Sequence, residues 1–442
     1  MAGFRHGSPT ARTGVPASVN TYLKYQFNEN DLQELRMLSE KSTETVRATL
    51  PAVGAAIGDI AELFYAKLFA AHPELLRDLF NRGNQNAGLQ KQALAGSVAA
   101  FATHLVAHPD TGPDVMLHRI AHKHASLGVT REQYPVVHRH LFAAIAEVLG
   151  EAVTPEVAEA WDEVYWLMAN ALIAIEERLY AEQQVLAGDV WRTWTVAARV
   201  EETADCTTFH LTPADGSPAP APKPGQYVSV QVELPDGARQ IRQYSLSGAP
   251  AAPVRSITVK RVHGPAATGP DGEVSNHLHT RIATGDTLRV SAPYGDLVLR
   301  DSAAPVLLAS AGIGCTPMLS MLAHLAETGH PAPVTVLHAD RSPADHALRG
   351  DHRALTHKLP DASARFWYEA GAEPGDGEGR LDLSDVPVAP GTTAYLCGPL
   401  PFMRSVRAQL LAKGVPAADI HYEVFGPDLW LASTSAPAEA SA

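Results

Sequence analysis

The hydrophobic periodicity of this chain changes twice, and these changes most strongly limit what it can fold into. Up to about residue 187 the sequence is rich in Ala and Leu at helical spacing. After Gly188, alternating apolar and polar residues are separated by Pro, Gly and Asp turns, which predicts antiparallel strands. From Val306, short apolar runs alternate with helical stretches, the rhythm of a parallel sheet. Three domains of different architecture are therefore expected.

A chain of 442 residues has room for about three domains of ~150 residues each. We expect a multidomain protein with an N-terminal extension over residues 1–38, an all-α domain over 39–187, an antiparallel β-barrel over 188–302, an α/β domain over 303–430 and a tail over 431–442. The last 16 residues are mostly Ala, Ser, Thr and Pro, which is typical of a loose end.

The net charge and the cysteine content limit which binding partners and which cellular compartment are expected. A net charge of -13 argues against a nucleic-acid or anionic-membrane surface, since both need clustered Lys and Arg. Three distant cysteines suggest neither a disulfide framework nor a thiolate metal site. No apolar stretch reaches ~18 residues, and the first residues lack the apolar core of a signal peptide. We expect a cytoplasmic monomer that acts on small molecules without stable membrane insertion.

One helical stretch carries a histidine on its apolar face. At 100° per residue, a single arc is formed by Leu117, Ile120, Ala121, His124 and Leu127. His118 and His122 fall toward the opposite side and are expected to be solvated. A lone histidine on an apolar face is more often a hydrogen-bonded core residue than a metal ligand. Phase alone therefore leaves both interpretations of His124 open.

Two upstream stretches also direct polar groups inward. Gln90 lies one turn before an apolar stripe made by Leu94, Val98, Phe101 and Leu105. His104 lies at the edge of this stripe and competes with His124 as a candidate ligand. Tyr65 lies within a wide apolar arc, where a tyrosine at a core margin is the alternative interpretation.

The middle part contains two motifs that suit a flavin dinucleotide. In RQYS, Arg242 can neutralise a pyrophosphate, Tyr244 can lie against an isoalloxazine ring and Ser245 can hydrogen-bond its polar edge. In GEVSN, Gly272 permits close approach, and the amides and Ser275 at a helix start can hold phosphate. Each motif alone could be an ordinary strand or turn, but together they resemble the ferredoxin-reductase superfamily.

The last part contains a short glycine loop, AGIGCTPM, between an apolar strand and a helix. This setting suits a phosphate-binding loop, although a tight strand-to-helix turn is the alternative. A second loop, YLCGP, also follows a strand and resembles the superfamily's loop on the nicotinamide side. Cys397 in that loop would lie near the hydride path, but a buried structural thiol is nearly as good an interpretation.

Four segments of the helical part resemble a bacterial globin, and the match is best to the globin domain of flavohaemoglobins. They are LFYAKLF at 63–69, HPELLRDLFN at 72–81, NQ at 84–85 and KHASLGVTREQY at 123–134. With the later motifs in the family's order, the resemblance covers residues 39 to about 430. It implies an all-α globin domain, an antiparallel β-barrel FAD-binding domain and an α/β parallel-sheet NAD(P)-binding domain of ferredoxin-reductase type.

The resemblance also assigns roles in the globin domain. Phe80 would wedge the haem, His124 would be the proximal iron ligand, and the opposite face would be lined by Tyr65, Gln90 and Leu94. Tyr134 and Glu176 would stand behind the histidine, where a carboxylate makes the imidazole more electron-rich. A solvated helical carboxylate is the alternative for Glu176.

In the other two domains the resemblance implies two sets of binding residues. The FAD set is Tyr227, Arg242, Gln243, Tyr244, Ser245, Lys260, Gly272, Val274, Ser275 and Phe425. The NAD(P)H set is Gly312, Gly314, Cys315, Thr316, Pro317, Cys397, Gly398 and Pro399. Cys315 stands where some relatives have glutamine, and its role stays open. Phe425 would cover the flavin ring, although an aromatic residue of the C-terminal core is the alternative.

The activity that the resemblance implies is nitric oxide dioxygenation with haem b, FAD and NAD(P)H. Two NO and two O2 would become nitrate as one NAD(P)H is oxidised, with hydride passing to FAD and single electrons to the haem. The alternatives are a flavin reductase for ferric, quinone or hydroperoxide acceptors and a haem-based gas sensor. The choice between NADH and NADPH is open, because HADRS supplies both Asp340, which favours NADH, and Arg341, which favours NADPH.

Overall fold

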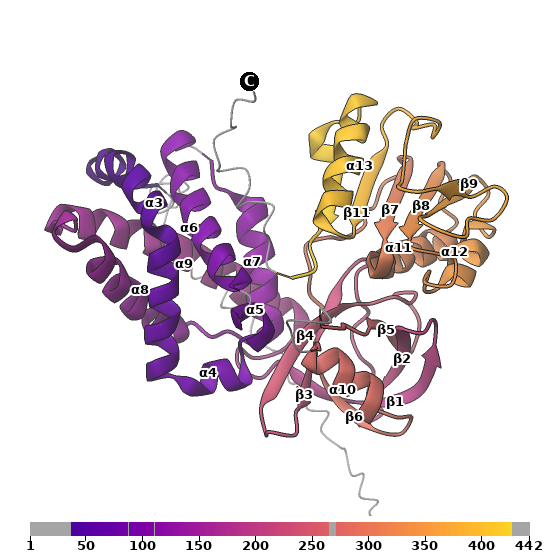
Figure 1. Cartoon of the computed structure of the whole chain (residues 1–442), viewed down its shortest axis with the longest axis horizontal. Helices are drawn as coiled ribbons and strands as arrows, with labels where there is room; N and C mark the ends of the chain where they lie inside the picture. Colours follow the sequence, from indigo (N-terminus) through magenta and orange to yellow (C-terminus); the bar gives the residue numbers. More distant parts are fainter. Residues whose placement is uncertain (1–36, 87, 110, 265–270, 427–442) are drawn as a thin grey trace, which may run out of the picture.

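The computed structural model describes residues 37–86, 88–109, 111–264 and 271–426 and shows three packed domains (Figure 1). Almost all of the expected N-terminal extension and the whole of the expected tail lie outside these ranges. Within them, no helix is long and apolar enough to cross a membrane.

The first domain is all-α. Its helices are α3 (Glu40–Ala71), α4 (Pro73–Asp78), α5 (Arg82–Asn86), α6 (Leu89–Ala107), α7 (Asp114–Leu127), α8 (Gln133–Leu149) and α9 (Pro155–Gln183). Side-chain caps fix two of the starts: Ser39 accepts from the Ser42 amide, and Thr154 accepts from the Val157 amide ahead of Pro155. α3 packs against α6, α8 and α9 around a core that includes Phe64.

The second domain is a six-stranded antiparallel sheet in the order β4-β3-β6-β1-β2-β5. The strands are β1 (Trp191–Glu201), β2 (Cys206–Pro213), β3 (Tyr227–Glu233), β4 (Arg239–Ser245), β5 (Arg255–Lys260) and β6 (Thr287–Ser291). An isolated bridge from Leu246, just after β4, to Ile257 in β5 joins the two ends of this order, so the sheet curls into a barrel. Helix α10 (Glu273–Arg281) packs against β4 and β5.

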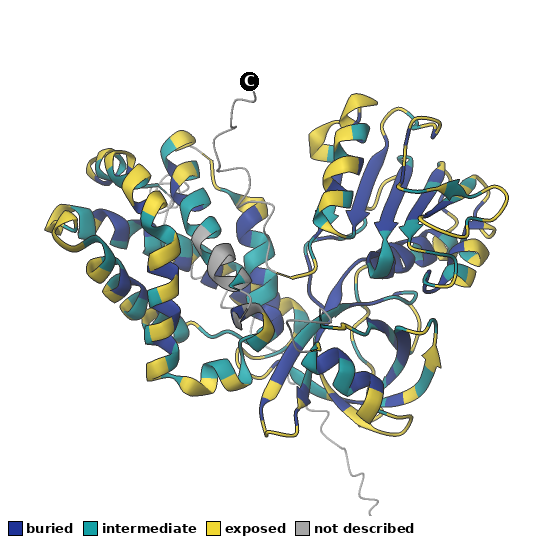
Figure 2. Cartoon of the chain, in the orientation of Figure 1, coloured by how far each residue is buried: buried dark blue, intermediate teal, exposed yellow. Residues whose placement is uncertain are grey.

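The third domain is a parallel sheet in the order β10-β9-β8-β7-β11-β12. Its strands are β7 (Val306–Ala311), β8 (Val334–Asp340), β9 (Ala362–Tyr368), β10 (Gly377–Glu378), β11 (Thr393–Cys397) and β12 (Ile420–Glu423). The helices are α11 (Cys315–Thr328), α12 (Arg349–Thr356) and α13 (Leu400–Ala412). β7 and β11 are buried along nearly their whole length (Figure 2), as apolar runs in a two-sided parallel sheet require. Chain order reverses between β7 and β11, which is where ligands bind in such sheets.

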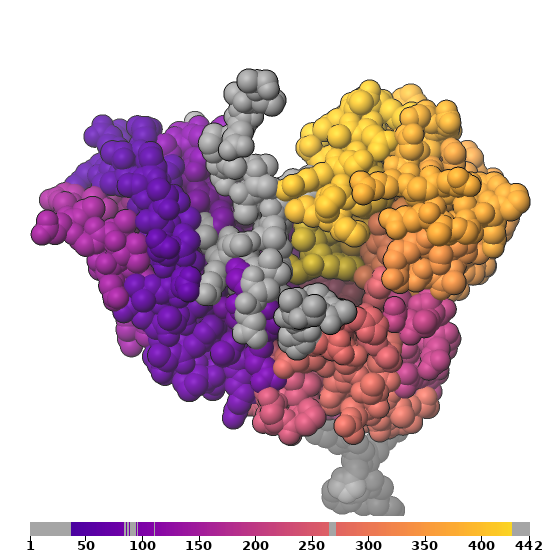
Figure 3. Space-filling view, in the orientation of Figure 1, coloured from indigo at the N-terminus to yellow at the C-terminus, as the bar shows by residue number. Residues whose placement is uncertain are grey.

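Helix α7 contacts both of the other domains. Ser126 in α7 accepts a hydrogen bond from Ser229 of β3 across 3.0 Å, and Arg119 donates to the main-chain oxygen of Tyr422 in β12 across 3.2 Å. The α-domain and the parallel-sheet domain lie on either side of a hollow above the barrel (Figure 3). α7 therefore links the α-domain to both of the other domains.

The expectation that His122 is solvated is wrong. Its side chain is half-buried, and Nδ1 accepts a hydrogen bond from the Gly295 amide across 3.1 Å. The helical phase correctly turns His122 away from the core of the α-domain. The barrel, however, covers the face of α7 on which His122 lies. Burial, helped by the charge of His118, lowers the pKa of His122 to about 4.

The His122→Gln variant is predicted to reduce acid sensitivity. The unfolded histidine takes up a proton below about pH 6.5, whereas the folded one resists protonation down to about pH 4. Stability is therefore lost as the pH falls through this window, by about 2 kcal/mol at pH 5 from this group. Glutamine can still accept from Gly295 and does not titrate. Between pH 8 and pH 5, the urea midpoint of unfolding should fall less in His122→Gln than in wild type or in the exposed-site control His108→Gln. An equal fall in all three proteins would contradict the prediction.

Candidate functional site

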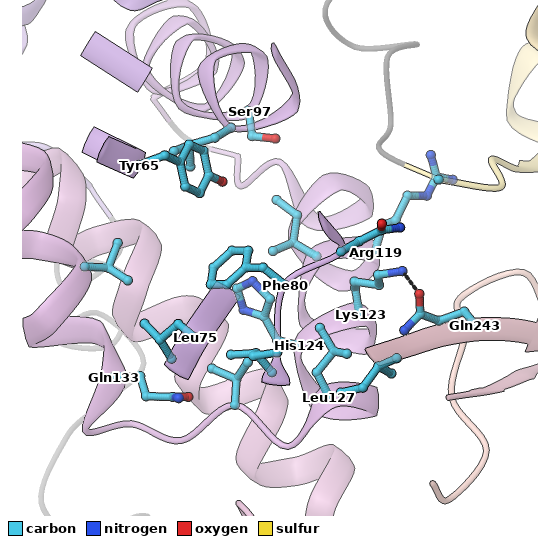
Figure 4. A pocket seen from close by; sticks show the side chains of 18 of the residues that line it. Tyr65, Leu75, Phe80, Ser97, Arg119, Lys123, His124, Leu127, Gln133 and Gln243 are labelled. Carbon is cyan, nitrogen blue, oxygen red and sulfur yellow. Dashed lines mark hydrogen bonds between the residues drawn. The ribbon is translucent and has the colours of Figure 1, made fainter. Parts of the chain in front are cut away.

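One cavity of about 1210 Å3 extends from the α-domain into the barrel. Sites for a single small molecule usually measure about 300–1000 Å3, so this cavity is large enough for two groups. Its α-domain part is mainly apolar and is bounded by Tyr65, Phe80 and His124 (Figure 4). Its barrel part includes Tyr244 and Ser275.

His124 is held from behind by two buried groups. Its Nδ1 lies 2.8 Å from Glu176 Oε1 and 3.1 Å from the Tyr134 hydroxyl, and that hydroxyl donates to the same Glu176 oxygen across 2.7 Å. Glu176 is only 2% exposed, so the solvated interpretation of this residue is wrong. Burial and the Glu176 charge raise the pKa of Tyr134, which stays a hydrogen-bond donor. The carboxylate orients the imidazole and leaves Nε2 as the nitrogen that can bind a ligand.

His104, the competing candidate, is not placed for this role. Its Nε2 lies 2.9 Å from the main-chain oxygen of Thr111. Among the described residues that line the cavity, the histidines are His72 and His124. The ring of His72 instead makes an edge contact with His140, and its Nδ1 lies 3.3 Å from Glu74. His124 is therefore the histidine of the cavity whose ring is oriented by buried side chains behind it.

The wall opposite His124 carries a buried phenol. Tyr65 is 5% exposed, and its ring lies 5.5 Å from that of Phe69 and 5.9 Å from that of Phe80. Burial raises the pKa of Tyr65, so it is a neutral donor, and a buried Gln85 side chain partly opposes the shift. Gln85 was not among the predicted site residues, although it lies in the globin-like NQ segment. Leu94 lines the cavity as predicted.

The predicted polar residue at position 90 lies partly outside the described structure. The main chain of Gln90 belongs to α6, but its side chain is outside the described residues. Its role stays a prediction.

The barrel part of the cavity combines a half-buried cation, Arg242, with a helix start. Its lining residues from this domain and its linkers are Tyr227, Ile241, Arg242, Gln243, Tyr244, Ser245, Lys260, Val262, Asp271, Gly272, Glu273, Val274, Ser275 and Asp296. Burial lowers the pKa of Arg242, which marks a cation short of counter-charge. At Gly272, an added Cβ would lie 2.7 Å from Val262 Cβ and 2.8 Å from Ser275 Oγ, so only glycine fits. A guanidinium facing the start of α10 suits a phosphate-bearing ligand.

The two parts of the cavity meet where α7 touches β4. Lys123, the residue before His124, donates a hydrogen bond to Gln243, the residue before Tyr244 (Figure 4). Gln243 in turn donates to Ser229 Oγ across 2.9 Å. Burial lowers the pKa of Lys123 to about 8. The side that holds His124 is thus fixed directly against the side that holds Tyr244.

The glycine loop lies at the carboxyl end of β7, pressed against the end of β11. An added Cβ at Gly314 would lie 2.3 Å from the Cys397 carbonyl oxygen and 2.8 Å from the Gly398 nitrogen. Thr316 donates to the Ile313 carbonyl across 3.0 Å and steadies the turn into α11, in which Pro317 is also buried. The two predicted loops therefore form one structure, with Pro399 capping α13 beside them.

The cysteines of these loops are buried structural groups. Cys315 and Cys397 are both 0% exposed, and burial raises the pKa of each thiol. Neither presents a thiolate to a ligand, which favours the structural interpretation of Cys397.

Phe425 lines the cavity and is 48% exposed, so the interpretation of this ring as part of the C-terminal core is wrong.

Comparison with known proteins follows the same three-part division. The globin family model matches residues 62–172, and the model of the oxidoreductase NAD-binding domain matches residues 308–408. The flavohemoprotein of Bordetella pertussis is 44% identical, covering 88% of this chain and 99% of its own length, and that of Rhizobium meliloti is 41% identical, covering 89% and 100%. This chain belongs to the flavohemoprotein family.

Solved flavohemoprotein structures agree with the observed fold. The flavohemoglobin of Malassezia yamatoensis, solved with bound FAD and heme, has a TM-score of 0.81 and 37% identity, covering 88% of this chain and all of its own. The FAD/NAD-binding part of the nitric oxide dioxygenase of Vibrio cholerae has a TM-score of 0.51 and 37% identity over 53% of this chain and 99% of its own. The expected fold class of this flavohemoprotein is confirmed.

Replacing Gly314 by alanine is predicted to damage the third domain selectively. The added methyl would overlap the main chain of β11, which cannot rotate away, and such overpacking costs about 1–3 kcal/mol. Thermal unfolding should show an earlier transition, and NADH should reduce the flavin more slowly. Gly350→Ala is the matched control, because an alanine there meets nothing within 4 Å. Equal stability of the two variants would contradict the predicted clash.

Proposed function

We propose that this flavohemoprotein is a nitric oxide dioxygenase that uses NAD(P)H, FAD and haem b to convert NO and O2 to nitrate. The observation that carries the proposal is the continuous cavity, in which a histidine backed by a buried carboxylate and a flavin-type motif meet through Lys123 and Gln243. An oxygen carrier or sensor would need only the first part of this cavity.

The residues of the α-domain fit a haem. His124 Nε2 would bind the iron, Phe80 would pack on the macrocycle, and the apolar lining would exclude water. When bound, haem b supplies the iron at which O2 and NO react. The Tyr65 hydroxyl would donate a hydrogen bond to the diatomic ligand, and the side-chain amide of Gln90 is predicted to donate another. Glu176 and Tyr134 would keep the histidine electron-rich, which favours reaction over storage.

The residues of the barrel fit FAD, which accepts a hydride and releases single electrons. Arg242 would neutralise the pyrophosphate together with the start of α10, which runs through Val274 and Ser275. Tyr244 would stack on the ring from one side, and the exposed Phe425 would cover it from the other. Tyr227, Gln243, Ser245 and Lys260 would contact its polar edge.

The third domain would deliver the hydride. Gly312, Gly314, Cys315, Thr316 and Pro317 form the loop and helix start that would hold the nucleotide phosphates, and Cys397, Gly398 and Pro399 form the adjoining wall. Cys315 contributes main chain and packing here, since its buried thiol donates weakly to the Ala347 carbonyl across 3.9 Å.

The proposed domain boundaries follow from the same elements. The globin domain over 39–187 ends between α9 and β1, the FAD domain over 188–302 ends between β6 and β7, and the NAD(P) domain over 303–430 closes after β12. We also propose a cytoplasmic monomer. Three free, buried thiols fit a reducing compartment.

Anaerobic addition of NADH to the purified protein is predicted to reduce flavin and haem in turn, and addition of O2 with NO should then produce nitrate. Absorption spectra follow the two cofactors, and an NO electrode follows the turnover. In His124→Ala, stable haem binding should be lost while flavin reduction remains. Fast NADH oxidation with the haem left ferric would refute the dioxygenase and leave a reductase for other acceptors.

Glu176→Gln is predicted to lower NO consumption by about 10- to 100-fold while haem stays bound, because the amide keeps the shape but loses the charge behind His124. The iron–histidine stretching band in resonance Raman spectra should move to lower frequency. Glu177→Gln is the matched control, since this neighbouring carboxylate is exposed. An unchanged stretching band in Glu176→Gln would refute the proposed role of the carboxylate.

A further inference from the structure

The residues at the end of β8 determine whether the extra 2′-phosphate of NADPH can be accommodated. In parallel sheets of this kind, the residue after the second strand meets the adenosine ribose. Here that strand ends at Asp340, whose side chain is 4% exposed. Its Oδ1 accepts from the Arg341 amide across 2.9 Å, and its Oδ2 lies 3.4 Å from His338 Nε2. Asp340 is therefore turned into the domain and is engaged by protein groups.

Arg341 points the other way, with 58% of its side chain exposed, but two carboxylates hold it. Asp345 forms an ion pair with its guanidinium, and Asp205, in the turn before β2 of the barrel, lies 3.8 Å away. We call these three residues the acidic clamp. Asp345 is fixed by a 2.6 Å hydrogen bond from Ser342, and Asp205 by a 2.8 Å contact with His263.

Both carboxylates of the clamp face solvent in part, Asp345 with 30% and Asp205 with 28% of the side chain exposed. The His263 contact, chiefly, holds the pKa of Asp205 below its usual value, so this residue is anionic at neutral pH. The clamp thus carries two negative charges and one positive charge. A 2′-phosphate, which is itself close to a dianion, would have to compete with both carboxylates for one guanidinium.

Lys260 lies beside the phosphate loop and is not placed to discriminate between nucleotides. Lys260 Nζ lies 3.9 Å from where a Cβ would stand on Gly312, the first glycine of the phosphate loop. The pyrophosphate proposed to lie on this loop is common to NADH and NADPH. The difference between the two nucleotides therefore falls on the clamp.

We propose that the acidic clamp of Asp205, Arg341 and Asp345 makes this protein select NADH over NADPH. The inference rests on the proposed hydride transfer from NAD(P)H to the flavin. The clamp neutralises Arg341, the arginine at the end of β8 that could recognise a 2′-phosphate, and presents net negative charge to such a phosphate. The free ribose of NADH carries no such charge and is not repelled.

The test compares NADH with NADPH in the anaerobic reduction of the flavin, without NO or O2, and compares the binding of 5′-ADP with that of 2′,5′-ADP to the oxidised protein. Wild type should favour NADH and 5′-ADP. Asp205→Asn and Asp345→Asn should each shift both ratios toward the phosphorylated nucleotide by about tenfold, the size expected for one carboxylate facing a dianion across a few ångströms of solvated surface. The two residues lie in different domains, so a folding defect in one variant leaves the other informative.

Two further variants complete the design. Adding Arg341→Gln to the double variant Asp205→Asn/Asp345→Asn should reduce the shift, because the freed guanidinium would no longer bind the phosphate, while the relief of repulsion by the two carboxylates remains. Asp385→Asn, at an exposed position between β10 and β11, is the matched control for loss of one negative charge and should keep the wild-type ratios. Equal use of both nucleotides by wild type, or unchanged ratios in both asparagine variants, would overturn the inference. Failure of both nucleotides to reduce the flavin would instead overturn the proposed function on which it rests.

Discussion

The packing of α7 between the other two domains is the constraint on which the rest of the structure depends. One side of this helix turns His124 into the cavity, while its neighbour Lys123 bonds to Gln243 of the barrel. Farther along, Arg119 reaches the main chain of β12, and its guanidinium lies 4.5 Å from the Tyr422 ring. Because an α-helix is stiff over four turns, these contacts fix the histidine relative to both nucleotide-binding domains at once. A path for single electrons needs such a fixed separation, whereas a carrier of diatomic ligands would not.

Burial of Glu176 is the second requirement, and it explains why three residues act together. A carboxylate removed from water loses several kcal/mol of hydration unless donors replace the water. The Tyr134 hydroxyl and the His124 Nδ1 proton supply those donors, and both meet the same oxygen. In return, the negative charge fixes which imidazole nitrogen carries the proton. The chemistry proposed for the cavity thus depends on a group that never touches it, since Glu176 lies behind the histidine.

The sequence predicted local features well and contacts between distant residues poorly. Periodicity placed each domain type, and helical phase turned His124 toward the core, because both properties depend on residues within a few turns. Phase could not distinguish a ligand from a core histidine, since the decisive partner, Glu176, lies 52 residues away. Phase also could not predict the burial of His122, because the barrel covers a face that is exposed in the α-domain alone. The same holds for Gln240, a fully buried amide that donates to the Arg77 and Phe80 carbonyls of the α-domain, across 3.0 and 3.2 Å.

The nucleotide site shows how a motif rule can point to one residue while the structure uses another. The rule assigns NADH preference to a carboxylate after the second strand, which is Asp340. Yet His338, which contacts Asp340, stacks on His346 with ring centroids 3.8 Å apart. His346 Nε2 lies 3.0 Å from His352 Nδ1, so Asp340 is connected to a buried cluster of imidazole rings. The charge that a nucleotide meets therefore comes from Asp345 and from Asp205 of a different domain. Sequence position identifies the strand end, but the charge presented there depends on side-chain direction and on a contact between domains.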